Sequence, residues 1–291
     1  MAKDTQVLYK EDAKYPNLLV AISDSPEQLY YKGTWQDELF ENCLAVVGSR
    51  HMTSYGKRAT EQLVGEVARA GVTIVSGFMY GVDATAHKAA LEAGGKTIAV
   101  MPCGIERIHP EHQKDLYQSI LETGGLILSE WDGSAMPAFW TYPKRNRIVA
   151  GLCKATLIVE AGLKSGSLIT AELAKKFGRK VFAVPGPITS EVSKGTAKLL
   201  QEGALLASSP NDILEYYDKK ALFEKKPNFF HSKSGFEPIE QKVLEVLQRE
   251  SLEADLLART LGVSAAQLGT TLSLLELQGI IKQEGGKYYV N

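Results

Sequence analysis

Short apolar runs alternate with amphipathic stretches between residues 44 and 217. Short apolar runs separated by helical repeats are typical of βα units that feed a mostly parallel sheet. The runs predict strands at residues 44–47, 72–76, 97–101, 126–129, 156–159, 181–184 and 204–206. The repeats predict helices at residues 55–70, 82–93, 113–122, 167–177 and 196–201. Because right-handed crossovers place helices on both faces of such a sheet, we expect an α/β fold with a Rossmann-like, doubly wound sheet.

The pattern changes after residue 217. Residues 218–235 contain several lysines and few apolar residues, which predicts a linker. Beyond it, helical patterns cover residues 239–247, 254–261 and 264–277, and a hairpin pattern covers 280–283 and 287–290. This order predicts a small C-terminal winged-helix domain over residues 236–291. Residues 1–43 are expected to form an N-terminal extension that packs on the Rossmann-like domain of residues 44–217.

Charge and cysteine content narrow the functions to consider. The net charge of −1 gives no overall preference for a polyanion, but residues 44–217 hold 19 basic and 16 acidic side chains, whereas residues 235–291 hold 5 and 8. Any nucleic-acid contact is therefore expected in the middle of the chain. Cys43, Cys103 and Cys153 are odd in number and far apart, which favours buried thiols over a disulfide or metal site. No segment has the pattern of a signal peptide or a membrane helix, so we expect a cytoplasmic protein without membrane contact.

Three predicted strands run directly into turns of small residues. In an open α/β sheet, ligands bind outside the carboxyl ends of the strands, and small residues at helix starts let backbone N–H groups approach an anion. We therefore expect a phosphate-binding site at these turns. Its candidate residues are Gly48, Ser49, Arg50, Ser76, Gly77, Gly81, Lys164, Ser165, Gly166 and Ser167. The alternative is that the glycines only permit tight turns.

Residues 137–147 combine aromatic rings, cations and an amide in a segment that leads into a helix. Rings beside cations suit a single strand whose bases stack while its phosphates are neutralised. The candidate residues are Phe139, Trp140, Tyr142, Lys144, Arg145, Asn146 and Arg147. In the alternative interpretation, Pro143 starts a helix, Lys144 and Arg147 are solvated, and Phe139 or Trp140 anchors the core.

Several enzyme signatures are missing. The first βα turn lacks GxGxxG, so no dinucleotide cofactor is expected. Residues 95–97 resemble the end of a P-loop, but they enter a strand instead of a helix. Asp83 and His87 have a spacing suited to acid–base chemistry, although a helix-start carboxylate beside a histidine is the simpler interpretation. His109 and His112 are interpreted as surface loop residues, so we predict no catalytic residue, no cofactor and no metal.

The second helix of the predicted winged-helix motif, residues 264–277, contains no cation. A helix that reads duplex DNA needs Arg, Lys, Asn or Gln aimed at bases and phosphates. Because the whole domain is also net negative, a protein-contact or structural module is favoured over a duplex reader.

A set of short motifs is spread between residues 15 and 217. The motifs are Tyr15-Pro16, Leu29-Tyr30-Tyr31-Lys32-Gly33, Gly48-Ser49-Arg50, Val75-Ser76-Gly77, Gly81-Val82-Asp83, Pro143-Lys144-Arg145-Asn146-Arg147, Val159-Glu160-Ala161, Ser165-Gly166-Ser167 and Phe182-Ala183-Val184-Pro185-Gly186. This set resembles the DNA-processing protein A family, also called Smf, whose members bind single-stranded DNA during natural transformation and help load the recombinase RecA onto it.

The resemblance implies roles for particular residues. Arg50 and residues 144–147 would contact the DNA backbone, the glycine turns would line a phosphate pocket, and the protein would act as a homodimer. The family usually has a cation at the position of Tyr80, so either one phosphate contact is weaker here or stacking replaces it.

Two other functions compete with single-stranded DNA binding. Related Rossmann-like proteins hydrolyse nucleoside monophosphates with a Pro-Gly-Gly-x-Gly-Thr turn, but this chain has Pro185-Gly186-Pro187-Ile188 instead. A transcriptional regulator acting through the winged helix is opposed by the absence of cations from the recognition helix. We therefore expect a protein that protects incoming single-stranded DNA, helps load RecA and catalyses no reaction.

Overall fold

The computed structural model describes residues 5–219 and 237–290. The chain divides into two compact units between residues 222 and 223. Of the predicted linker, only Asp218 and Lys219 lie within the described residues, so the predicted domain boundaries stay a prediction. Among the described residues, no helix is both long enough and apolar enough to cross a membrane.

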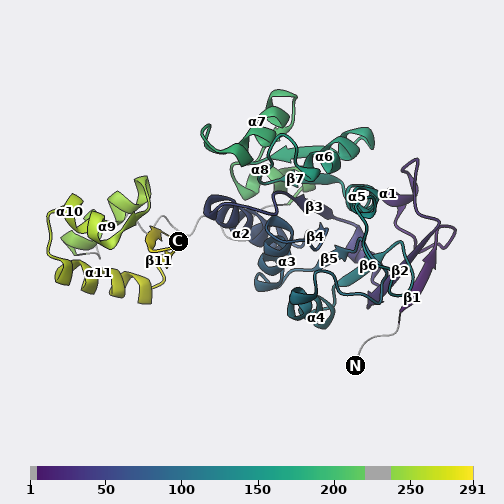
Figure 1. Ribbon diagram of the computed structural model, residues 1–291, viewed down its shortest axis with the longest axis horizontal. Coiled ribbons are helices and arrows are strands. Elements are labelled where there is room, and N and C mark those ends of the chain that lie inside the picture. Colours follow the sequence, from purple (N-terminus) through teal and green to yellow (C-terminus); the bar gives the residue numbers. More distant parts are fainter. Residues whose placement is uncertain (1–4, 220–236, 291) are drawn as a thin grey trace. The chain divides into compact units, whose positions relative to one another are not determined.

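The larger unit is built on a nine-stranded sheet in the order β1-β2-β6-β5-β4-β3-β7-β8-β9 (Figure 1). The strands are β1 (Gln6–Tyr9), β2 (Gln28–Gly33), β3 (Cys43–Val47), β4 (Thr73–Ser76), β5 (Thr97–Val100), β6 (Leu126–Ser129), β7 (Ala155–Ile158), β8 (Lys180–Ala183) and β9 (Leu205–Leu206). Strands β3 to β9 are parallel. Every predicted strand is present, with ends that differ by at most one residue. The predicted α/β fold with a mostly parallel sheet is confirmed.

The N-terminal extension adds two strands that the sequence pattern did not predict. β2 pairs antiparallel with β6, with Tyr30 opposite Ser129, and β1 pairs antiparallel with β2. Leu29 and Tyr31 belong to one core cluster, while Tyr30 packs against another. Because both faces of β2 are covered, it lacks the alternation of polar and apolar residues that marks a half-buried strand.

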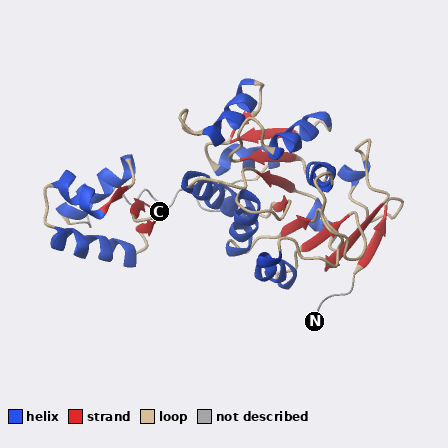
Figure 2. Ribbon diagram, in the orientation of Figure 1, coloured by secondary structure: helices blue, strands red, loops and turns tan. Residues whose placement is uncertain are grey.

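Helices cover both faces of the sheet (Figure 2). They are α1 (Asn17–Val20), α2 (Ser54–Arg69), α3 (Val82–Glu92), α4 (Lys114–Glu122), α5 (Thr141–Gly151), α6 (Gly166–Lys176), α7 (Lys194–Gln201) and α8 (Pro210–Leu214). Short 3₁₀ segments occur at Asp37–Phe40, Glu111–Gln113, Glu191–Ser193 and Glu215–Tyr217.

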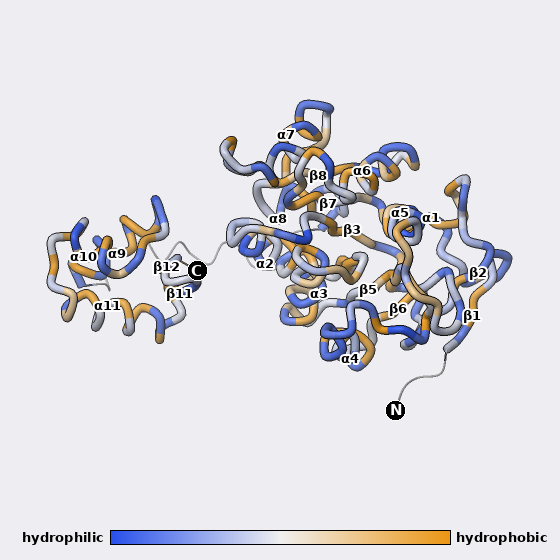
Figure 3. Tube along the Cα trace, in the orientation of Figure 1, coloured by the Kyte–Doolittle hydropathy of each residue, from blue (hydrophilic) through white to orange (hydrophobic). Residues whose placement is uncertain are grey.

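Successive side chains of β3 point to opposite faces of the sheet and pack in two different hydrophobic cores. Ala45 and Val47 pack with residues of α1, α5 and α6, whereas Leu44 and Val46 pack with residues of α2 and α3. Figure 3 shows the hydrophobic positions gathered along the strands at the centre of this unit. Burial on both faces explains why the strands read as continuous apolar runs. It also leaves only the strand ends open to a ligand.

The smaller unit has the predicted winged-helix architecture. Its elements are α9 (Pro238–Arg249), β10 (Leu252–Glu253), α10 (Ala254–Leu261), α11 (Ala265–Leu277), β11 (Ile281–Glu284) and β12 (Lys287–Val290). The three strands pair in the order β10-β12-β11. Leu244, Leu257, Leu272 and Leu275 are buried in a core of their own. The prediction of a small winged-helix domain is confirmed.

Candidate nucleic-acid-binding site

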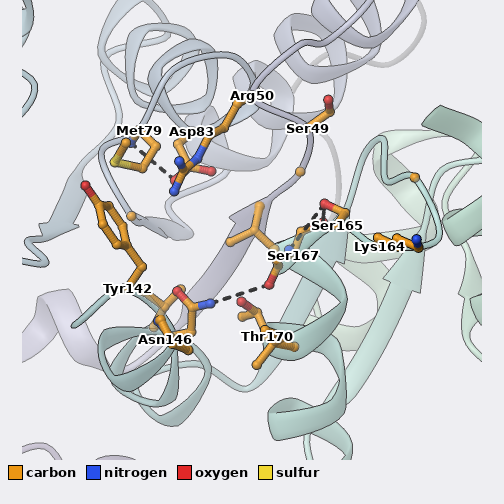
Figure 4. Close-up of a pocket in the computed structure, with 18 of the residues that line it drawn as sticks. Ser49, Arg50, Met79, Asp83, Tyr142, Asn146, Lys164, Ser165, Ser167 and Thr170 are labelled. Atoms are coloured by element: carbon orange, nitrogen blue, oxygen red, sulfur yellow. Dashed lines mark hydrogen bonds between the residues drawn. The ribbon is translucent and has the colours of Figure 1, made fainter. Parts of the chain in front are cut away.

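A cavity of about 580 Å³ opens at the carboxyl edge of β3, β4 and β7, where a ligand is expected in this fold. The predicted site residues that line it are Gly48, Ser49, Arg50, Gly77, Tyr142, Arg145, Asn146, Lys164, Ser165, Gly166 and Ser167. Figure 4 shows the side chains from the turns and from α5 around this opening. Three turns and one helix, separated in sequence, therefore meet at one place.

The glycines allow the turns to approach one another closely. A Cβ atom at Gly48 would lie 2.6 Å from Cγ2 of Val82, and Gly81 has a φ of +70° with its α-carbon facing the carbonyl of Ser49. In contrast, a Cβ atom at Gly166 would meet no atom within 4 Å. Packing between turns thus explains Gly48 and Gly81, while open space for a ligand lies beside Gly166.

A buried carboxylate holds the turn that carries Arg50. The Glu160 side chain accepts hydrogen bonds from the Thr53 backbone N–H (2.8 Å) and hydroxyl (2.5 Å), and the Glu160 carbonyl accepts one from Ser49 N–H (2.7 Å). Thr53 also caps α2 by accepting from Gly56 N–H. The Arg50 side chain remains exposed, with Cζ 5.0 Å from the centroid of the Tyr142 ring. Arg50 is therefore held in a defined place and stays accessible to an anion.

Arg145 lines the same cavity but is almost fully buried, with 3% of its surface exposed. Its Nη1 donates to the carbonyls of Gly77 and Val100, at the ends of β4 and β5. Burial lowers the pKa of Arg145 to about 10, and burial also raises the pKa of Asp83 while the Arg145 charge opposes that rise. Arg145 thus stays protonated at neutral pH and ties α5 to the strand ends.

The structure gives Lys144 and Arg147 different surroundings. Arg147 is only 6% exposed and pairs with Glu130 and Asp24, whereas the Lys144 side chain is exposed, lies 3.5 Å from Glu130 and faces the Trp131 ring at 5.7 Å. Lys144 and Arg147 are three residues apart on α5, so both side chains reach Glu130, but only Arg147 is buried there. Neither residue lines the cavity. The predicted DNA contacts of both residues stay predictions, and burial favours a structural role for Arg147.

Phe139 and Trp140 lie outside the cavity and in solvent. Phe139 is 97% exposed and Trp140 is 60% exposed, with the Trp140 ring edge-on to Trp131 at 6.2 Å. The alternative that either residue anchors the core is therefore wrong. Their stacking on bases stays a prediction.

Two further predicted residues, Ser76 and Gly81, also do not line the cavity. Ser76 is fully buried, and its hydroxyl donates to the Val46 carbonyl at 2.6 Å, so it joins β4 to β3. Gly81 lines a second cavity next to Tyr80. Ser76 therefore supports the sheet beneath the site instead of facing a ligand in this conformation.

The remaining cavity residues suit a phosphate. Arg50 and Lys164 are exposed cations, and α6 begins at the cavity with Ser165 as its N-cap. Asn146 donates to the Gly166 carbonyl at 3.5 Å and joins α5 to this helix start. An anion at the start of α6 would lie in the favourable field of the helix, in the same cavity as two cations.

Family models match both units. The model described as DNA recombination-mediator protein A matches residues 6–218, and the DprA winged helix domain model matches residues 232–287. The chain belongs to the DNA recombination-mediator protein A family. The resemblance inferred from the motifs is confirmed.

Individual proteins named DNA processing protein A or Smf are similar to this chain in sequence and structure. The chain is 40% identical over 283 residues to protein Smf of Escherichia coli, covering 94% of this chain and 74% of Smf. It superposes on DNA processing protein A of Streptococcus pneumoniae with a TM-score of 0.68 and 40% identity, covering 73% and 74% of the two chains. For DNA processing protein A of Helicobacter pylori, whose single-stranded DNA binding mode has been described, the TM-score is 0.67 at 32% identity, covering 76% and 100%.

Two histidines that were interpreted as surface loop residues contact aromatic residues of the site. His109 Nε2 lies 2.9 Å from the Tyr142 hydroxyl, and His112 stacks on Tyr80. Burial, together with the charge of Arg50, lowers the pKa of His109, so the ring is neutral at pH 7. A signal was available in the sequence, because the loop holding both histidines follows β5 at the same edge of the sheet as the glycine turns.

Proposed function

We propose that this chain binds single-stranded DNA in the cavity at the carboxyl edge of the sheet and catalyses no reaction. The observation that carries this proposal is the meeting of Arg50, Lys164 and the start of α6 with the Tyr142 ring in one opening. Cations and a helix start bind phosphate, while an aromatic ring offers a face to an unpaired base. The single-stranded DNA binding of the Helicobacter pylori relative supports the proposal.

The first experiment compares the affinity for single-stranded and duplex DNA at two or more salt concentrations. We expect tighter binding to the single strand, because bases in a duplex are stacked and cannot reach Tyr142. Replacing Arg50 with Ala should weaken binding about tenfold, as expected for a charge-assisted hydrogen bond. The slope of log affinity against log salt should flatten by about 0.7 for the lost phosphate contact.

Two variants serve as controls. Arg50→Lys should keep the slope and part of the affinity, because Lys retains the charge but lacks the planar fork. Lys180 is exposed at the start of β8, the opposite edge of the sheet, so Lys180→Ala should change neither quantity. If folded Arg50→Ala binds with unchanged affinity and slope, the cavity is not the DNA site.

We further propose that the protein hands its strand to RecA, in the cytoplasm, and works as a homodimer. A dimer is supported by the edge strand β9, where Leu205 and Leu206 are 42% and 49% exposed on a strand that pairs on one side only. Leu206→Lys should give a monomer in analytical ultracentrifugation.

RecA filament growth on DNA covered by single-strand-binding protein should be faster in the presence of the wild-type protein. If RecA filament growth is not faster, the proposed role in loading RecA is wrong, and the proposed DNA binding is unaffected.

An enzymatic function is the alternative, because related folds hydrolyse nucleotides. Within the described residues, no three His, Cys, Asp or Glu side chains are grouped as metal ligands. His87 is buried with its Nδ1 bonded to Thr97, away from the cavity lining. Incubation with nucleoside mono- and triphosphates should therefore release neither base nor phosphate. Turnover above a buffer control that is lost in Asp83→Asn would favour the enzyme.

A further inference from the structure

A second cavity, of about 370 Å³, adjoins the DNA site. Met79 lines the first cavity and the next residue, Tyr80, lines the second. Gly81, which lines the second cavity, packs so closely on the Ser49–Arg50 backbone of the first that a Cβ atom at Gly81 would lie 2.8 Å from the Arg50 carbonyl oxygen. A strand that places one phosphate beside Arg50 therefore has the second cavity within reach of a neighbouring nucleotide.

The second cavity contains two exposed aromatic rings held parallel. Tyr80 and His112 have ring centroids 5.2 Å apart and an interplanar angle of 6°, and Tyr80 is 44% exposed. Tyr80 belongs to the loop between β4 and α3, whereas His112 belongs to the loop between β5 and α4. Exposed rings that lie flat against each other present a ready surface on which a third ring can stack.

The charges of this cavity differ from those of the first. One cation, Lys88, and one carboxylate, Asp115, line it together with the two rings. A phosphate would gain little there, because the carboxylate offsets the ammonium group. An uncharged planar group suits the cavity better, and the planar groups of a DNA strand are its bases.

We propose that Tyr80 and His112 form a stacking subsite for one base of the bound single strand, next to the nucleotide whose phosphate contacts Arg50. This subsite rests on the proposed single-stranded DNA binding. It assigns the two cavities different parts of the same strand: the first takes a phosphate with its cations, and the second takes a base with its rings.

The test uses two single strands of equal length, an oligodeoxythymidylate and a strand of abasic residues with the same phosphates. Tyr80→Ala should weaken binding to the thymidylate by about fivefold or more, the range measured for base–aromatic stacking, and leave binding to the abasic strand unchanged. His112→Ala should act in the same direction, and Tyr80→Phe should bind as the wild type. Tyr9 is 47% exposed on the edge strand β1, so Tyr9→Ala is the matched control and should change neither affinity.

The outcomes separate this proposal from the function on which it rests. Arg50→Ala should weaken binding to both strands, since phosphate contacts do not depend on bases. If the wild type binds neither strand, both proposals fall. If it binds both strands and Tyr80→Ala either changes nothing or weakens both affinities equally, the stacking subsite alone is overturned. Tyr80→Leu keeps the apolar bulk without a ring, so thymidylate binding at wild-type strength by this variant would overturn it as well.

Discussion

Two helices of this chain differ in their charged residues: α5 of the larger unit carries cations, whereas α11 of the smaller unit carries none. α5 begins at the cavity edge and contributes Tyr142, Arg145 and Asn146 to it. α11 is the second helix of the winged-helix motif, has no cation, and exposes Leu274 and Leu277 at 46% and 85%. A fold known for DNA binding is therefore present in the unit whose surface is poorly suited to phosphate.

The ligand that a domain binds depends on the side chains at its surface and not on its fold alone. Winged helices bind duplex DNA when the recognition helix carries donors for bases and phosphates. In this chain the donors gather instead at the carboxyl ends of parallel strands, where no recognition helix exists. An α11 without cations and with exposed leucines suits contact with a protein.

The largest effect is expected when the two units are produced as separate fragments. A fragment ending near Tyr217 should keep most of the single-strand affinity, because every residue of the cavity precedes that point. A fragment of residues 235–291 should bind neither single-stranded nor duplex DNA in a gel-shift assay. Each fragment has its own buried core, and circular dichroism would verify that it folds. Duplex binding by the small fragment would reverse our assignment of the DNA site.

A second prediction sharpens the picture of α5. Arg147→Ala should lower the free energy of unfolding by about 3 kcal/mol, because it leaves the mostly buried Glu130 with only the more distant Lys144. Lys144→Ala, one turn away and exposed, should change the stability by less than about 0.5 kcal/mol. Urea denaturation would measure both. A stable Arg147→Ala protein with a flattened salt slope would instead support a direct DNA contact of Arg147.

The larger unit should lose stability at acid pH because of His87. His87 is fully buried, and burial lowers its pKa to about 3 from an ordinary 6.5, so the unfolded chain binds a proton that the folded chain does not between these values. Stability must therefore fall as the pH falls through this window, by about 2 kcal/mol between pH 6.5 and pH 5. Residues 237–290 contain no histidine and lack this source of acid sensitivity.

The His87→Gln variant isolates this effect. Its stability should depend less on pH than that of the wild type by the stated amount. Asp83 acts in the opposite direction because burial raises its pKa, but its contribution cancels in the difference between the two proteins. Equal pH dependence in wild type and His87→Gln would show that folding does not lower the pKa of His87.

The smallest expected effect compares the N-caps of α2 and α11. Thr53 accepts from Gly56 N–H and Ser264 accepts from Gln267 N–H, so Ser264→Ala should cost about 1 kcal/mol of stability. Thr53→Ala should cost more, because the Thr53 hydroxyl also donates to the buried Glu160 carboxylate. Only Thr53→Ala should also reduce DNA affinity, because Thr53 is bonded to the carboxylate that holds the Arg50 turn. Thr53→Ser should restore both properties. Fluorescence anisotropy would measure DNA binding. Loss of binding in Ser264→Ala would show that α11 contributes to DNA affinity.

Local sequence patterns were enough to predict the parallel strands, their order in the chain, and the three turns that meet at one edge of the sheet. These features follow from local patterns: apolar runs of strand length, glycines at strand ends and a helix start after each turn. The motifs over residues 15–217 also placed the chain in its family, because they combine residue types and spacing that few folds share.

Tertiary packing sets which of the predicted cations stay exposed at the cavity. Arg145 and Arg147 are both charged and close to Lys144 in sequence, yet the rotation of α5 against the sheet buries both of them among carbonyls or carboxylates. The pairing of Tyr80 with His112 likewise joins two loops that no sequence pattern connects. Local patterns specify elements, whereas the direction of a side chain depends on how those elements pack, and that packing is set by contacts between residues far apart in the chain.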